Sequence, residues 1–205
     1  MCIARTSKAA ARLSASFRAR EGVEKIYHAV VAGTLSGRGT REDFLDRADG
    51  GSTSARAIGA KRAVLEWEAV KVAPSATALL RCPRTGDART LVRVRLVTGR
   101  KHQIRVQLAE MGHPVVGDVR YGRSRRGKGW ADSGPSGDME PLGDRSIMLH
   151  ASELAVPHPT RVGCVVRVVA PPPAAWGALC GEDLLEAVFG KNLPASICEA
   201  PAVRS

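Results

Sequence analysis

Aromatic residues, long apolar runs and closely spaced cysteines are all scarce in this chain of 205 residues. Aromatic side chains make up 4% of it, which argues against a surface on which successive bases of a single strand stack. No apolar run approaches the ~20 residues of a membrane-spanning helix, so a transmembrane helical protein is excluded. The five cysteines include no Cys-x-x-Cys pair, which disfavours zinc knuckles and a disulfide framework.

These absences favour an intracellular protein with reduced, mostly buried thiols. The N-terminal residues contain no long apolar segment typical of a secretory signal. We therefore expect a cytoplasmic or organellar protein (in a mitochondrion or plastid) that is not secreted and has no membrane partner. Nothing in the sequence fixes the oligomeric state, and a monomer is the simplest expectation.

Positive charge is in excess and unevenly distributed. The chain has 31 Lys and Arg against 20 Asp and Glu, a formal net charge of +11. Residues 1–180 carry +13 and residues 181–205 carry −2. Such an excess attracts a polyanion, most often a nucleic acid. A generally basic protein with no such partner is the alternative interpretation.

Local patterns predict an α+β fold with a mixed, mainly antiparallel sheet flanked by helices and loops. Thr6 or Ser7 can cap a helix that carries Ala10, Leu13 and Phe17 inward and ends at Gly22. A second helix is expected over residues 100–111. Residues 36–60 resemble a long exposed connection, and residues 122–146 a loop rich in Gly, Ser and Asp. Strands are expected over residues 25–31, 63–72, 78–82, 90–97, 147–151, 153–156 and 162–169.

The chemically richest segment spans residues 96–122. Thr98-Gly99 introduces the second helix, whose first turn would carry Arg100, Lys101 and His102. A helix N-terminus exposes free N–H groups and a partial positive charge, so three adjacent basic side chains favour binding of a phosphate or carboxylate. Arg105 would follow one turn later, where a fixed guanidinium can hold a carboxylate through two hydrogen bonds.

This segment resembles the signature of the RluA-type pseudouridine synthases. Thr-Gly-Arg-x-His-Gln-Ile-Arg is followed by Gly-His-Pro-x-x-Gly-Asp-x-x-Tyr-Gly, both in the order of that family. The segment from Lys25 to Gly33 is similar to the family's Lys-x-Tyr-x-Ala-x-Val-x-Gly strand, and Trp67 and Leu149-His150-Ala151 match later elements. The likeness implies that residues 1–176 form a pseudouridine synthase catalytic domain, incomplete at its N-terminus, followed by a tail over residues 177–205.

The resemblance implies an isomerase that converts uridine to pseudouridine in structured RNA, either ribosomal or transfer RNA, without a metal or other cofactor. Tyr27 would stack on the flipped base, with its hydroxyl as a possible base, and Arg105 would pair with the catalytic Asp. RNA contacts are expected from a group that lies on the first strand and around the start of the second helix, namely Lys25, Arg100, Lys101, His102 and Gln103.

The chain departs from the family in the nucleophile. The family carries its Asp in an Arg-Leu-Asp-x-x-Thr-Ser-Gly motif directly before the strand that leads into the segment matching Ala4-Arg5-Thr6. No Arg-Leu-Asp occurs in this chain, so we expect the motif to lie upstream of Met1. The alternatives are an RNA-binding protein of the same fold without catalysis, such as a ribosome-assembly factor, and a basic structural subunit of a ribonucleoprotein.

Each candidate residue also has a simpler structural interpretation. Tyr27 could pack within the sheet, and Arg105 could form a surface ion pair with Glu110 or Asp118. His102 and Gln103 could hydrogen-bond to the backbone and orient the helix, which we favour over a chemical role. The scattered spacing of three other histidines suits turns better than a metal site: His113, His150 and His158.

Overall fold

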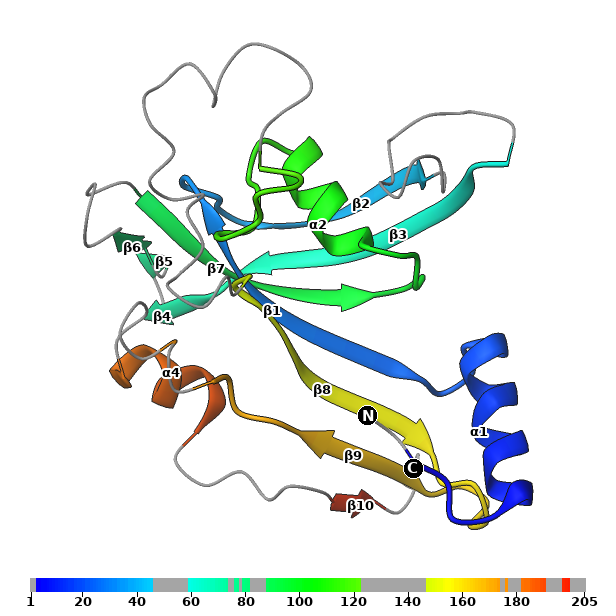
Figure 1. Ribbon diagram of the computed structural model, residues 1–205. Helices are drawn as coiled ribbons and strands as arrows, with labels where there is room; N and C mark the ends of the chain where they lie inside the picture. The colour runs from blue at the N-terminus through cyan, green and yellow to red at the C-terminus, as the bar shows by residue number, and fades with distance from the viewer. Residues whose placement is uncertain are drawn as a thin grey trace.

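The computed structural model describes residues 3–45, 59–73, 76–77, 79–81, 88–122, 147–173, 176, 182–190 and 197–199. One main sheet has the strand order β10-β9-β8-β1-β7-β3-β2, with β6 also paired to β7 (Figure 1). Every pairing of these strands is antiparallel, and the predicted α+β class is confirmed. The strands are β1 (Glu24–Ala32), β2 (Arg38–Leu45), β3 (Lys61–Ala69), β6 (Leu79–Arg81), β7 (Ala88–Leu96), β8 (Leu149–Pro157), β9 (Val165–Val169) and β10 (Ile197–Glu199). A separate pair joins β4 (Lys71–Ala73) to β5 (Ala76–Thr77).

Among the described residues, three helices flank this sheet: α1 (Ser7–Ala19), α2 (Gln103–Glu110) and α4 (Glu182–Phe189). In Figure 1, α2 lies over the half of the sheet that contains β2, β3 and β7, whereas α1 stands at the end of β8 and β9. The α2 side chains Ile104 and Leu108 are buried in the same core cluster as Ala29 and Val92 of the central strands. The central strand β1 therefore has a face toward α2, the Tyr27 face, and an opposite face that carries His28.

The first helix begins as predicted and ends earlier. The Thr6 hydroxyl accepts a hydrogen bond from the Ala9 N–H at 3.2 Å, which caps the helix. Ala9 is the buried residue of this helix, while Ala10, which was expected to face inward, is exposed. The helix stops at Ala19 rather than Gly22, because Arg20 takes up the left-handed conformation at φ 62°.

The prediction that residues 36–60 form an exposed connection is wrong for their first part. Arg38–Leu45 is the edge strand β2, paired along its whole length with β3. Its burial pattern is inverted, since Asp43 is buried while Phe44 is 37% exposed. Arg41 and Gln107 both donate hydrogen bonds to the Asp43 carboxylate, at 2.8 and 2.9 Å. Because this paired carboxylate is buried and the neighbouring Phe44 is exposed, the hydrophobicity pattern does not predict the strand.

The later elements also differ in detail from the prediction. The two short strands expected over 147–156 are one continuous strand, β8, with a bulge opposite β1 between Ile26 and Tyr27. The loop expected over residues 122–146 lies almost wholly outside the described residues. Within the predicted tail, α4 packs Leu185 and Val188 against the core.

His28 is a buried histidine on the face opposite Tyr27. The Ser152 hydroxyl donates to the Ile26 carbonyl at 3.2 Å, so the His28 Nδ1–H is the donor in its 2.8 Å contact with Ser152 Oγ. The Phe189 ring packs edge-on at 4.6 Å between centroids. Burial, with the nearby charge of Arg93, lowers the pKa of His28 from 6.5 to about 4.

We expect this histidine to make the protein acid-sensitive. The pKa of His28 is lower in the folded than in the unfolded chain. The protein therefore has its full stability above pH 6.5, and the part that depends on neutral His28 is lost as the pH falls toward 4. The expected loss is about 3 kcal/mol of unfolding free energy, at 1.36 kcal/mol per pKa unit. Denaturant melts of wild type and His28→Gln from pH 7 to pH 4 measure it. An identical pH slope in the two proteins would contradict the assignment.

Candidate RNA-modification site

The central strand presents two of the predicted site residues side by side. Lys25 and Tyr27 alternate onto the Tyr27 face of β1, where Tyr27 is flanked by Val94 of β7 and Ala151 of β8. The Tyr27 ring is half-buried and packs against the hydrophobic core at one edge. Burial raises the pKa of its hydroxyl, so the phenol is protonated at neutral pH. In this state Tyr27 offers a flat ring and a hydrogen-bond donor.

The turn between β7 and α2 is held by a buried network around Gln103. The Gln103 Oε1 accepts from the Thr98 hydroxyl at 2.8 Å and from the Arg100 N–H at 2.9 Å. Its Nε2 donates to the Val64 carbonyl at 3.0 Å, and Gln103 is 2% exposed. All these contacts are within the protein, as the structural interpretation of Gln103 predicts.

The same turn corrects the predicted start of the helix. His102 lies in the left-handed region at φ 54°, and regular helix begins at Gln103. Arg100, Lys101 and His102 are therefore residues of the turn and not of the first helical turn. Arg100 is held from the side, because its Nε donates to the Arg62 carbonyl at 3.0 Å. Lys101 is exposed.

Arg105 forms a bidentate ion pair with Asp118. Its Nε and Nη2 donate to the two carboxylate oxygens at 2.6 and 2.7 Å. The Asp118 side chain is 0% exposed and that of Arg105 is 16% exposed. Asp118 also accepts the N–H groups of Arg120 and Tyr121, both at 3.1 Å. Asp118 thus joins helix α2 to the Gly-Asp-x-x-Tyr-Gly segment.

Tyr121 and His102 complete this cluster. The Arg105 guanidinium lies 5.0 Å from the centroid of the Tyr121 ring, and the Tyr121 hydroxyl is 3.0 Å from His102 Nδ1. Burial and the surrounding cations, foremost Arg105, lower the pKa of His102, so its imidazole is neutral at pH 7. The sequence predicted Asp118 only as a possible surface partner of Arg105. It did not predict that Tyr121 contacts both His102 and Arg105.

Four of the predicted residues therefore fall into two groups, while Arg100 and Lys101 lie in the turn before α2 and Gln103 lies at the start of that helix. Arg105 and His102 belong to the Asp118 cluster, while Lys25 and Tyr27 share a face of β1. No hydrogen bond or ring contact joins Tyr27 to Arg105 in the part of the chain that the structure describes.

Over the described ranges, no group of three or more His, Cys, Asp or Glu side chains is arranged to hold a metal ion. None of the helices among these residues is both long enough and apolar enough to cross a membrane.

A family model and several known proteins resemble this chain, and those described below are pseudouridine synthases. The family model for RNA pseudouridylate synthase matches residues 1–110. Ribosomal large subunit pseudouridine synthase D of Xylella fastidiosa is 33% identical over 178 residues, which cover 84% of this chain and 47% of that protein. The tRNA pseudouridine synthase C of Yersinia pestis is 33% identical over 165 residues, covering 78% of this chain and 59% of the relative.

Structural comparison agrees with the sequence relatives. Human RNA pseudouridylate synthase domain containing 1 superimposes with a TM-score of 0.60 at 27% identity, over 84% of this chain and 63% of that one. The chain spans about half the length of the curated relatives it matches. The match to half of the chain by the family model, together with the shared fold and motifs, shows that the chain belongs to the RluA-type RNA pseudouridine synthase family.

Proposed function

We propose that this protein converts uridine to pseudouridine in a structured RNA. The observation that carries the proposal is the placement of Tyr27 and Lys25 on one face of the central strand, which offers a ring for a base next to a cation for a phosphate. The relatives named above modify ribosomal and transfer RNA, and both remain candidate substrates here. A uridine must leave its stack before its glycosidic bond becomes accessible, so the ring of Tyr27 would support the flipped base.

The reaction breaks the bond between ribose C1′ and uracil N1 and forms a bond from C1′ to C5. The proton on C5 is lost and N1 gains one, so no oxidant or cofactor is required. The protonated Tyr27 hydroxyl can donate a hydrogen bond to the detached uracil, and the ring can hold its plane. Arg105 would keep the nucleophilic carboxylate ionised through the donors that Asp118 leaves open.

Asp118 is not suited to be that nucleophile. Its side chain has no exposed surface, and its two oxygens accept hydrogen bonds from the Arg105 guanidinium and from two backbone N–H groups. A carboxylate that attacks a nucleotide must reach the sugar or base, which this one does not. The structure supports Asp118 as the residue that positions Arg105, with a different carboxylate as nucleophile.

The test is tritium release from RNA that contains [5-³H]uridine, incubated with the 205-residue chain and with the endogenous protein, whose intact mass gives its N-terminus. Release by either form, with pseudouridine found in the digested RNA, supports the proposal. Tight RNA binding by both forms without any release would instead support the non-catalytic RNA-binding protein. That alternative is favoured by one observation, the saturation of one edge of Arg105 by Asp118.

A further inference from the structure

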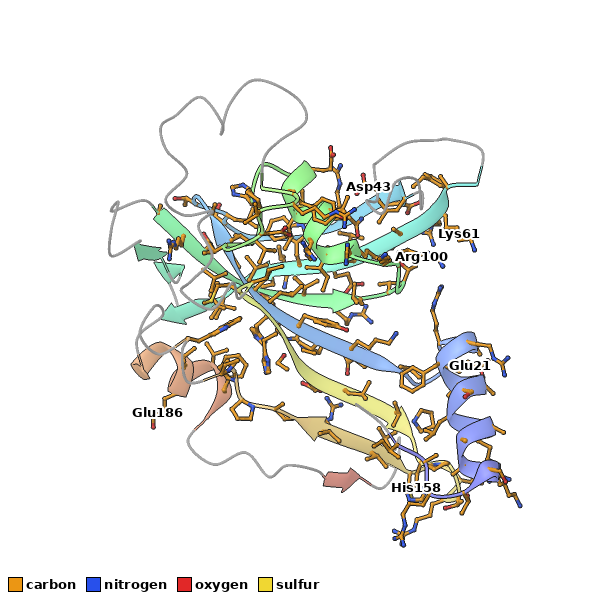
Figure 2. All side chains as sticks on the ribbon, in the orientation of Figure 1. Glu21, Asp43, Lys61, Arg100, His158 and Glu186 are labelled. Carbon is orange, nitrogen blue, oxygen red and sulfur yellow. The ribbon has the colours of Figure 1, made fainter. Side chains whose placement is uncertain are left out.

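A cavity of about 480 Å³ lies on the face of the sheet that carries His28, opposite the Tyr27 face. Its volume falls within the range of roughly 300–1,000 Å³ that small-molecule sites occupy. Figure 2 shows helix α4, which carries the labelled Glu186, beside β4 and the end of β9, and the last residues of this helix line the cavity. The apolar part of the lining comes from Val70, Val169, Val188 and Phe189. The rest of the lining, from β1, β3, β7 and β8, is largely polar.

His28 brings a ring nitrogen without a protein partner to this cavity. Only 6% of the residue is exposed, and its Nδ1–H donates to the Ser152 hydroxyl at 2.8 Å. Nε2 is therefore the nitrogen left for a ligand, and none of the described residues forms a hydrogen bond with it. Because burial lowers the pKa of His28 to about 4, the ring is neutral at pH 7 and Nε2 acts only as an acceptor. A ligand that engages this nitrogen must present a hydrogen-bond donor.

Arg93 supplies hydrogen-bond donors next to this acceptor. It lies directly opposite His28 in the pairing of β7 with β1, which places the two Cβ atoms about 4.5–5.5 Å apart, and both residues line the cavity. Within the described part of the chain, no hydrogen bond or ion pair engages the Arg93 guanidinium, although the exposed Glu68 lies opposite it on β3. The other carboxylate of the lining, Glu153, is paired with Arg167. The cavity thus combines one acceptor with one set of free donors.

We propose that this cavity binds a free nucleoside whose base presents an N–H beside a carbonyl, the edge that uracil and guanine share. The base N–H would donate to His28 Nε2, and the adjacent carbonyl would accept from the Arg93 guanidinium. The flat ring would pack against the apolar wall that Val188 and Phe189 provide. A phosphate dianion fits less well, because it offers no donor to the imidazole. In nucleosides, cytosine and adenine also lack a ring N–H beside a carbonyl. The site lies behind the proposed catalytic face and does not depend on the proposed RNA substrate.

The test is a titration of the ¹⁵N-labelled 205-residue chain with uridine and with guanosine, followed through the ¹⁵N resonance of His28 Nε2. We expect this resonance to shift as the lone pair accepts a hydrogen bond. The matched ligand is 3-methyluridine, in which a methyl group replaces the donor and the carbonyls are kept. Its Kd should be at least about tenfold higher than that of uridine, for loss of one hydrogen bond. Equal affinity for the two ligands would overturn the proposal, as would a resonance that neither uridine nor guanosine moves.

Arg93→Met removes the guanidinium from the cavity and should raise the Kd for uridine about tenfold, as for a hydrogen bond to a charged group. Arg95→Met is its matched control, two residues along the same face of β7 and outside the cavity lining. The Arg95 guanidinium is already held by both oxygens of Glu66, so this variant should change the Kd less than about twofold. Equal weakening by both variants would overturn the proposal. Loss of uridine binding in Tyr27→Ala, with wild-type affinity in Arg93→Met, would place the nucleoside on the Tyr27 face and overturn it too.

Discussion

Replacing Asp118 with alanine is expected to lower the free energy of unfolding by about 3–5 kcal/mol, the range for breaking one side of a buried ion pair. The variant leaves the Arg105 guanidinium, 16% exposed, without its two carboxylate acceptors. It also leaves the N–H groups of Arg120 and Tyr121 without the oxygen that they share. Chemical denaturation followed by circular dichroism measures the change.

Two controls separate burial from charge in this prediction. Glu42→Gln breaks the exposed bidentate pair between Glu42 and Arg62, whose geometry is as good, with contacts of 2.8 Å. This control should show little measurable change, because solvent screens an exposed pair. Asp118→Asn keeps the shape of the side chain and one acceptor oxygen. Its loss of unfolding free energy should therefore lie between the losses in Asp118→Ala and Glu42→Gln. Similar losses in Asp118→Ala and Glu42→Gln would contradict the structural role of Asp118.

The sequence predicted best where a strand alternates regularly. Over residues 90–97, where a strand is expected, Val92 and Val94 are fully buried and the intervening Arg93 remains partly accessible. Strand β1 and the cap of α1 at Thr6 were found for the same reason, since period and capping act over a few residues.

The sequence failed where a long-range contact reverses a local preference. Phe44 is exposed and Asp43 is buried in β2, because Gln107, 64 positions away, supplies a hydrogen bond to that carboxylate. The start of α2 shifted for a similar reason. Gln103 binds the Val64 carbonyl and the Thr98 hydroxyl, and this network holds His102 in a left-handed conformation. No window of a dozen residues contains this information.

The site residues show the same division. The motif indicated Arg105 as a carboxylate partner, and the structure places it against a carboxylate. It did not indicate that Asp118 is fully buried, because burial depends on how the Gly-Asp-x-x-Tyr-Gly segment folds back over α2. The role of Arg105 toward a second, catalytic carboxylate stays a prediction, as do the RNA contacts of Lys25, Arg100, Lys101, His102 and Gln103.

Replacing Tyr27 with alanine is expected to lower kcat/KM for pseudouridine formation by about 100-fold, in the form of the protein that is active. The loss of a stacked base costs about 1–3 kcal/mol, and the flipped uracil would also lose its orientation. RNA affinity should change far less, because phosphate contacts supply most of it. Tritium release and anisotropy, measured on the same preparations, separate the two effects.

The Tyr27→Phe variant separates the contribution of the Tyr27 ring to activity from that of its hydroxyl. Burial raises the pKa of the Tyr27 hydroxyl, which makes it a poor base at neutral pH and a competent donor. We therefore expect Tyr27→Phe to retain activity within about tenfold, the equivalent of one hydrogen bond, with an unchanged pH profile. Activity as low as in Tyr27→Ala would show that the hydroxyl takes part in proton transfer. Because the phenylalanine ring fills the same place between Val94 and Ala151, a difference between Tyr27→Phe and wild type reports on the hydroxyl, and a difference between Tyr27→Phe and Tyr27→Ala reports on the ring.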